Sequence, residues 1–193
     1  EQVVRTAGGN FVNDHIALRT FACQDPFVGI GTIARIFEAL GYVPSGCYQF
    51  PDKHLAAIHL QHPGGLLPKI FVSELQTWRL PPEAREIIQR VVRTHRMPVS
   101  DETLARVADC GALADADREA LARRLVAEFH ELPWNLPERA DVERLNAASQ
   151  YGAWVLVHGY NVNHFTSLIN SHGVDSLADI EKTIAALKAA GVP

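Results

Sequence analysis

The stretch that decides the fold is residues 12–21, which read V-N-D-H-I-A-L-R-T-F. Its aliphatic and β-branched residues favour an extended chain, in which side chains alternate between two faces. His15 and Arg19 therefore share one face, with Cα atoms roughly 13 Å apart at about 3.3 Å per residue. This spacing suits a small dianion bound by a metal at one end and by an arginine at the other. The plainer interpretation is a half-buried, hydrogen-bonded His15 and an Arg19 that reaches solvent.

The composition is that of an ordinary globular protein. With 193 residues, 47% of them hydrophobic, the chain can bury a substantial core. Its net charge of -4 and its lack of basic runs with interleaved aromatics argue against a nucleic-acid partner. The three cysteines form no C-x-x-C motif, which favours a reducing cytoplasm over a disulfide framework. No apolar run approaches the roughly 20 residues that span a bilayer, so no membrane partner is expected.

One helix and four extended segments are expected before residue 81. After the first strand, Asp25 as N-cap and Pro26 in the first turn predict a helix that runs to Leu40 and ends at Gly41. Turns that contain proline or glycine then separate three further extended segments. These lie at residues 42–50, 54–61 and 67–75. The predicted order of elements is βαβββ.

The remainder of the chain is expected to add helices and the start of a second module. Residues 153–169 are predicted as a strand interrupted near Gly159, and a helix with Ser176 as N-cap is predicted to end at Gly191. The predicted organisation is a first βαβββ module at 1–80, a helical insertion at 81–150 and the strand and helix of a second module at 151–193. All three parts are expected to pack as one domain.

Two strand–helix segments in the sequence are alike. Val12-Asn13-Asp14-His15 precedes the helix expected to end at Gly41, and Val162-Asn163-His164 precedes the one expected to end at Gly191. Two modules related by a pseudo-twofold axis would curve their sheets around one cavity. The two histidines would then face each other across that cavity.

A pair of neutral imidazoles is half of a metal site. The arrangement of two histidines and one carboxylate that holds non-heme iron(II) requires an Asp or Glu in addition and leaves positions for substrate and O2. Glu74 is a possible carboxylate within this chain. A charge on an edge strand is the simpler interpretation of Glu74.

Residues 29–34, G-I-G-T-I-A, match the G-x-G-x-x-A fingerprint of dinucleotide-binding proteins. The fingerprint requires a strand directly before it and a helix that opens on it. Here the glycines are expected inside a helix already begun at Asp25, so we favour close packing of a helix on a sheet. The sequence contains no H-E-x-x-H, G-x-S-x-G or P-loop motif.

Four stretches carry a family resemblance: N-D-H-I-A-L-R-T-F, L-G-Y-V-P-S-G, P-K-I-F-V-S-E-L and V-N-H-F-T. With them the sequence resembles the 2-oxoadipate dioxygenase/decarboxylase family, whose fold is similar to that of the vicinal oxygen chelate, or glyoxalase-like, proteins. The resemblance implies an α+β fold of glyoxalase-like βαβββ modules that form a curved sheet around a metal cavity. It also implies a helical insertion and a second module that is incomplete in this chain.

The same resemblance implies an Fe(II) enzyme of lysine catabolism. Such an enzyme converts a 2-oxo dicarboxylic acid, 2-oxoadipate, with O2 to 2-hydroxyglutarate and CO2. His15 and His164 match the family's metal-binding histidines, Arg19 matches its substrate-binding arginine, and His15 is also expected to contact the substrate. The third metal ligand, a glutamate late in the second module, is expected beyond Pro193.

Two alternatives stay open at the level of sequence. One is a glyoxalase-like isomerase, lyase or hydrolase that uses zinc or another divalent ion. The other is a small-molecule binding module without catalysis. The sequence predicts no oligomeric state.

Overall fold

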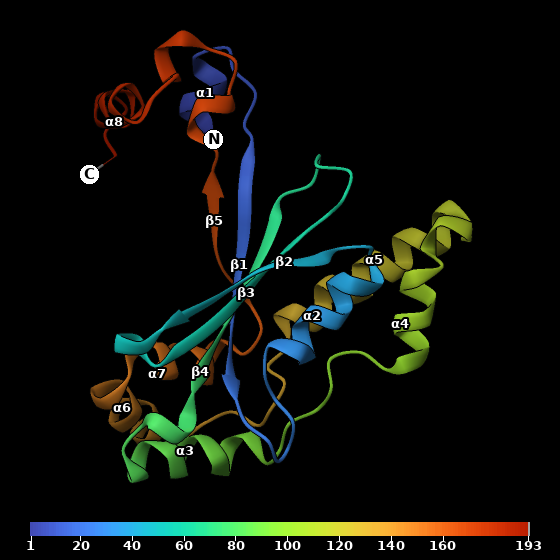
Figure 1. Ribbon diagram of the computed structural model, residues 1–193, viewed down its shortest axis with the longest axis vertical. Helices are drawn as coiled ribbons and strands as arrows, with labels where there is room; N and C mark the ends of the chain where they lie inside the picture. The colour runs from blue at the N-terminus through green and yellow to red at the C-terminus, as the bar shows by residue number, and fades with distance from the viewer. Residues whose placement is uncertain (193) are drawn as a thin grey trace. The chain divides into compact units, whose positions relative to one another are not determined.

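The computed structural model describes residues 1–192 and divides into two compact units (Figure 1). Unit 1 joins residues 1–16 to the segment from His164 onward, and unit 2 comprises Ala17–Asn163. The expected α+β fold class is confirmed, since the units contain both helices and strands of one sheet. The boundaries expected near residues 80 and 150, the packing as one domain and the arrangement in curved modules stay predictions.

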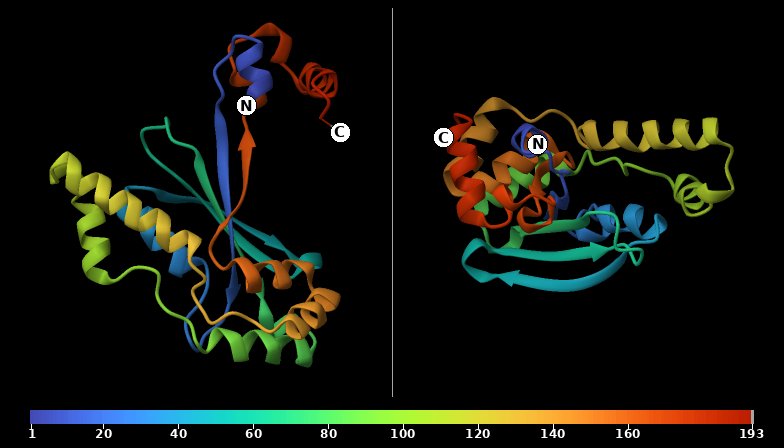
Figure 2. Two further views of the ribbon diagram at one scale, coloured as in Figure 1. Left: turned by 180° about the vertical axis from the view of Figure 1, so that it is seen from behind. Right: turned by 90° about the horizontal axis from the view of Figure 1, so that it is seen from above.

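Four strands form the sheet of unit 2. They are β2 (Val43–Phe50), β3 (Leu55–Gln61), β4 (Lys69–Gln76) and the second half of β1 (Asn13–Ala22). β2 pairs antiparallel with β3, and β3 pairs antiparallel with β4. With β5 (Val162–Ser167) the strand order is β2-β3-β4-β1-β5, which makes β4 a central strand. The predicted first strand and the three later extended segments are thus confirmed, and the hairpin of β2 and β3 is clear in Figure 2.

Alternation along β3 and β4 separates two faces of this sheet. Leu60, Ile70 and Val72 are at most 2% exposed and share one face, because Leu60 is paired with Ile70 in the register. Helix α2 (Ile30–Ala39) packs against these two strands. Phe71 and Ser73 point to the opposite face and are partly exposed. Leu75 also belongs to that opposite face and is 1% exposed, so buried side chains lie on both faces of the sheet.

Helix α2 begins later than the sequence predicts. The expected start at Asp25-Pro26 is wrong, because Cys23 and Val28 exchange two backbone hydrogen bonds of 2.8 and 3.1 Å and enclose that dipeptide in a turn. The helix starts at Ile30 instead. An N-cap residue next to a proline can begin a turn as well as a helix, and here the local backbone pairing decides between them.

The expected helices between residues 81 and 150 are confirmed. They are α3 (Pro82–Val92), α4 (Asp101–Ala108), α5 (Asp115–His130) and α6 (Arg139–Ala148). In residues 1–192, no helix is both long enough and apolar enough to cross a membrane.

Residues 150–158 form helix α7 (Gln150–His158), so the strand expected from Ala153 is wrong over its first half. Aromatic and β-branched residues favour a strand here by propensity. Ala153 and Leu156 are at most 5% exposed, and a helix buried on most sides shows no polar stripe by which to recognise it. Ser149 caps the helix by accepting the N–H of Gly152 at 3.0 Å. The second half of the prediction is confirmed as β5.

Unit 1 is held together by contacts between its two chain segments. Its elements are α1 (Gln2–Thr6), the first half of β1, most of β5 and α8 (Ile180–Ala189). The N–H of Leu168 donates to the carbonyl oxygen of Val12 at 2.9 Å. His172 is 3% exposed and bonds the hydroxyl of Ser167 at 2.8 Å and the carbonyl oxygen of Asn10 at 3.0 Å. These bonds tie the segment after β5 to the segment before β1.

Helix α8 also begins later than expected. Ser176 lies in a 3-10 turn and is not its N-cap. The cap is Asp179, whose carboxylate accepts the N–H of Lys182 at 2.8 Å. Both predicted helix ends are confirmed, because Gly41 and Gly191 have φ of +86° and +77°, the left-handed region that glycine favours.

The buried carboxylate of Asp141 joins α6 to α3. Asp141 is 2% exposed and accepts hydrogen bonds from Arg90 at 2.5 Å and Arg144 at 2.6 Å. The hydrogen bond from Arg90 is the main reason that the pKa of Asp141 lies below its usual value.

We expect Asp141→Asn to lower the free energy of unfolding by about 2 kcal/mol at pH 7, because two charge-assisted hydrogen bonds are weakened. A lowered pKa stabilises the folded state above the unfolded pKa, and this stabilisation is lost as the pH falls through the folded pKa. The difference between variant and wild type should therefore shrink below about pH 4. Urea unfolding at pH 7 and pH 3.5 measures it, and a difference independent of pH would contradict this role of the carboxylate.

Candidate functional site

Two histidines far apart in the sequence lie together in unit 1. His15 is the third residue of β1 and His164 the third residue of β5. The hydroxyl of Thr166 donates to the carbonyl oxygen of His15 at 3.3 Å, and the backbone hydrogen bond from Leu168 to Val12 lies directly beside these strands. The imidazole ring centroids are 5.6 Å apart with an interplanar angle of 72°. The structure thus brings together the two histidines that the sequence predicted as metal ligands.

A carboxylate orients the first of these rings. Oδ2 of Asp14 accepts a hydrogen bond from Nδ1 of His15 at 2.8 Å. Metal-binding histidines commonly donate their second ring nitrogen to a carboxylate in this way. Asp14 is a functional residue that sequence reasoning missed, and the signal that could have found it is its place directly before His15.

The donor set fits two of the three protein ligands of an iron(II) site. Within residues 1–192, no three His, Cys, Asp or Glu side chains are grouped so that they could hold a metal ion together. Within these residues the candidate metal ligands are therefore two imidazoles, His15 and His164, and Asp14 orients the ring of His15.

Arg19, predicted to bind substrate, lies in unit 2 and contacts two aromatic rings of α7. Its Cζ lies 4.8 Å from the ring centroid of Tyr151 and 5.4 Å from that of Trp154. Both distances are in the range of cation–π interactions. The side chain is partly buried, so the interpretation of Arg19 as a residue that simply reaches solvent does not describe it.

Glu74 lies at the start of helix α2. Its Oε2 accepts the N–H of Ile30 at 2.8 Å, which satisfies one of the unpaired donors of the first helical turn. Burial raises the pKa of Glu74, and the hydrogen bond from Ile30 opposes this shift. The interpretation of Glu74 as an edge-strand charge is wrong, because β4 is a central strand. Its contact with α2 gives the carboxylate a structural role without a metal.

Gly29 is the N-cap of α2 and Gly31 is its second residue, so the expectation that both glycines lie inside a helix begun at Asp25 is wrong. A Cβ on Gly29 would lie 2.8 Å from Oε2 of Glu74. Gly29 thus permits the close approach of the protein's own carboxylate. A phosphate would have to displace that carboxylate, which supports the packing interpretation over dinucleotide binding.

The three cysteines lie among the described residues, and none of them forms a disulfide. All three are free, as the sequence predicts. Burial is the main reason that the pKa of Cys23 rises to about 11, so this thiol stays protonated at neutral pH.

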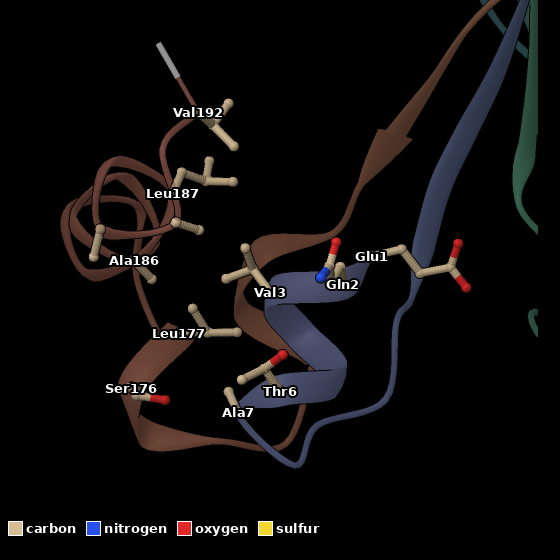
Figure 3. Close-up of a pocket in the computed structure, with 12 residues that line it drawn as sticks. Glu1, Gln2, Val3, Thr6, Ala7, Ser176, Leu177, Ala186, Leu187 and Val192 are labelled. Atoms are coloured by element: carbon tan, nitrogen blue, oxygen red, sulfur yellow. The ribbon is translucent and has the colours of Figure 1, made fainter.

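Unit 1 also contains a cavity of about 590 Å³ between α1 and α8. Figure 3 shows Val3, Leu177 and Leu187 directed toward this space. Neither of the two histidines lines it, and its lining is largely aliphatic. This cavity is therefore separate from the candidate metal ligands.

A family model described as 2-oxoadipate dioxygenase/decarboxylase matches residues 4–193. The chain belongs to this family. The resemblance inferred from the four sequence stretches is thus confirmed over nearly the whole chain.

Individual relatives agree with this assignment. A 2-oxoadipate dioxygenase/decarboxylase of chloroplasts or amyloplasts from Oryza sativa subsp. japonica is 33% identical over 182 residues, which cover 89% of this chain and 43% of the relative. A chloroplastic protein of the same description from Arabidopsis thaliana is 28% identical over 93% of this chain and 45% of that protein. The chain thus spans less than half the length of these curated relatives.

Solved structures show the same fold. The hydroxyglutarate synthase from Oryza sativa, crystallised in complex with 2-oxoadipate, is 31% identical with a TM-score of 0.75 over 98% of this chain and 57% of that one. A putative glyoxalase superfamily protein from Ralstonia eutropha JMP134 is 30% identical with a TM-score of 0.84 over 98% of this chain and 59% of that one. The likeness to a glyoxalase superfamily protein supports the expected kind of fold.

The sequence analysis missed the aromatic partners of Arg19. Tyr151 and Trp154 are three residues apart, and that spacing places two rings on one face only in a helix. Because a strand was expected from Ala153, this signal was not used.

The role assigned to Glu74 can be tested by truncation. We expect Glu74→Ala to lower the free energy of unfolding by about 1 kcal/mol, since the N–H of Ile30 loses its acceptor. Glu74→Gln keeps an acceptor and should cost less. Thermal unfolding of both variants, with iron content measured alongside, checks this. Loss of iron in Glu74→Gln at unchanged stability would contradict the structural role.

Proposed function

We propose that the protein containing this chain is an Fe(II)-dependent dioxygenase/decarboxylase that acts on a 2-oxo dicarboxylic acid. The preferred substrate is 2-oxoadipate, which with one O2 gives 2-hydroxyglutarate and one CO2. All atoms of the acid and of O2 are then accounted for in the two products. This reaction would place the enzyme in lysine catabolism, and the cytoplasm remains the predicted compartment.

The observation that carries the proposal is the pairing of His15 with His164 in unit 1, at a ring separation of 5.6 Å. Membership of the family and the similarity to a hydroxyglutarate synthase crystallised with 2-oxoadipate support the choice of substrate. A serine hydrolase or a P-loop enzyme would require motifs that this sequence lacks.

His15 and His164 would hold the iron, and a carboxylate from outside residues 1–192 would complete the ligand set. Bound iron would supply Lewis acidity and one-electron chemistry toward O2. Asp14, which accepts a hydrogen bond from Nδ1 of His15, would orient the imidazole ring for metal binding. His15 would also border the 2-oxo acid end of the substrate.

Arg19 would bind the carboxylate at the other end of the substrate. A guanidinium presents several N–H donors in one plane and pairs with a carboxylate through two parallel hydrogen bonds. Discrimination among 2-oxo acids would then follow from the presence and position of that second carboxylate.

A glyoxalase-like isomerase, lyase or hydrolase is the second candidate, favoured by the likeness to the Ralstonia eutropha protein. It would use a divalent metal without consuming O2. A binding module without catalysis would bind the 2-oxo acid and consume neither the acid nor O2. Oxygen uptake separates the leading proposal from both.

The central test is oxygen consumption by the full-length protein with Fe(II) and 2-oxoadipate. We expect O2 uptake and CO2 release in equal amounts. His164→Ala should remove one of the metal's nitrogen ligands, so that iron content, measured on the purified protein, and O2 uptake fall together. Full iron content in His164→Ala would contradict the assignment of this histidine. Turnover of 2-oxoadipate without O2 uptake would exclude the dioxygenase.

Arg19→Ala should have the opposite pattern of effects. We expect binding of 2-oxoadipate to weaken about 30-fold or more, because charge-assisted hydrogen bonds to one carboxylate are lost. Iron content should be unchanged. Calorimetric titration with 2-oxoadipate and with 2-oxohexanoate, which has a methyl group in place of the far carboxylate, checks this. An equal loss for both acids would refute the role of Arg19.

A further inference from the structure

The guanidinium of Arg19 is held by aromatic rings rather than by an acid. Tyr151 and Trp154 stand three residues apart in α7, so both rings reach the same cation. Within residues 1–192, Arg19 forms no ion pair with an Asp or Glu. A cation–π contact restrains the guanidinium without using its N–H donors. Those donors therefore remain available for a ligand.

Tyr151 is itself fixed to the sheet through Ser73. Its hydroxyl donates to the carbonyl oxygen of Ser73 at 2.9 Å and lies 3.0 Å from the Ser73 hydroxyl. Ser73 belongs to β4, the neighbour of β1 in the sheet. Arg19 stands on β1, so the ring that contacts Arg19 is anchored to the strand beside it.

The hydroxyl of Tyr151 stays protonated at neutral pH. Burial is the main reason that its pKa rises to about 12, although the contact with Ser73 and the charge of Arg19 oppose the shift. The ring therefore stays neutral and keeps its donor to the β4 backbone at neutral pH.

We propose that Tyr151, anchored by Ser73 and assisted by Trp154, is a positioning residue that presents the guanidinium of Arg19 to the far carboxylate of the substrate. This inference rests on the proposed function, in which Arg19 binds that carboxylate. The inference adds an explanation of substrate selectivity to the proposed function. By holding Arg19 in place, the rings of Tyr151 and Trp154 favour dicarboxylic over monocarboxylic 2-oxo acids.

The first test compares the two acids in variants of the full-length iron-loaded protein. Tyr151→Leu should weaken binding of 2-oxoadipate about tenfold and change binding of 2-oxohexanoate by less than about twofold, because only the dicarboxylic acid uses Arg19. Tyr151→Phe keeps the ring and loses the bonds to Ser73, so its effect should be smaller. In the Arg19→Ala background, Tyr151→Leu should cause no further loss.

A matched control is available in the same unit. Cζ of Arg35 lies 5.9 Å from the ring centroid of Phe27, which is 52% exposed. Phe27→Leu removes a cation–π contact of the same kind and should leave binding of both acids unchanged. Equal weakening of both acids by Tyr151→Leu would show general packing damage and overturn the proposal.

The second test needs no substrate. We expect the side-chain Nε–H order parameter of Arg19, measured by NMR relaxation, to be high in the wild type and to fall below about 0.6 in Tyr151→Leu. An unchanged order parameter would overturn the positioning role. Failure of the wild type to bind 2-oxoadipate would count against the proposed function instead, and the order parameter would still decide whether Tyr151 restrains Arg19.

Discussion

The pairing of β5 with β1 is the constraint on which the candidate metal site depends. Hydrogen bonds from Leu168 to Val12 and from Thr166 to His15 join the two strands. They place His15 and His164 on neighbouring strands although most of the chain separates them in sequence. The position of each imidazole is thus set by a strand rather than by a loop, and the backbone of each strand is fixed by its neighbour.

A comparable constraint acts on Arg19 in unit 2. The helical state of α7 sets Tyr151 and Trp154 on one face, and Ser73 anchors the tyrosine to the sheet. Two buried or half-buried carboxylates of this unit have partners within the chain. Glu74 accepts an N–H of α2, and Asp141 accepts hydrogen bonds from two arginines. Arg19 differs from them because, within residues 1–192, it contacts two aromatic rings and no acid, and a cation of this kind can bind an anion.

The two halves of the proposed chemistry follow different physical rules. An imidazole binds a metal through one lone pair, so its tautomer must be fixed, and Asp14 supplies the necessary acceptor. A guanidinium binds a carboxylate through several N–H groups, so its orientation must be fixed while its donors remain exposed. Aromatic contacts meet the second requirement better than an ion pair, since an acid would occupy the same donors.

Sequence patterns alone predict the strands of unit 2, the helices between residues 81 and 150 and the family, all of which are confirmed, and they single out His15, Arg19 and His164 as candidate site residues. These depend on local patterns: alternation, helical periodicity, glycine after a helix, and short motifs. Tertiary structure decided the start of α2, the helical state of the buried segment at 150–158 and the role of Glu74. In each of these cases local propensity permits two states. The pairing of Cys23 with Val28 selects the start of α2, and contacts with residues distant in sequence decide the other two cases. The repeat of Val-Asn before a histidine indicates that His15 and His164 meet, but only the folded chain decides that they do so on neighbouring strands, because strand pairing across that separation leaves no periodic signal in the sequence.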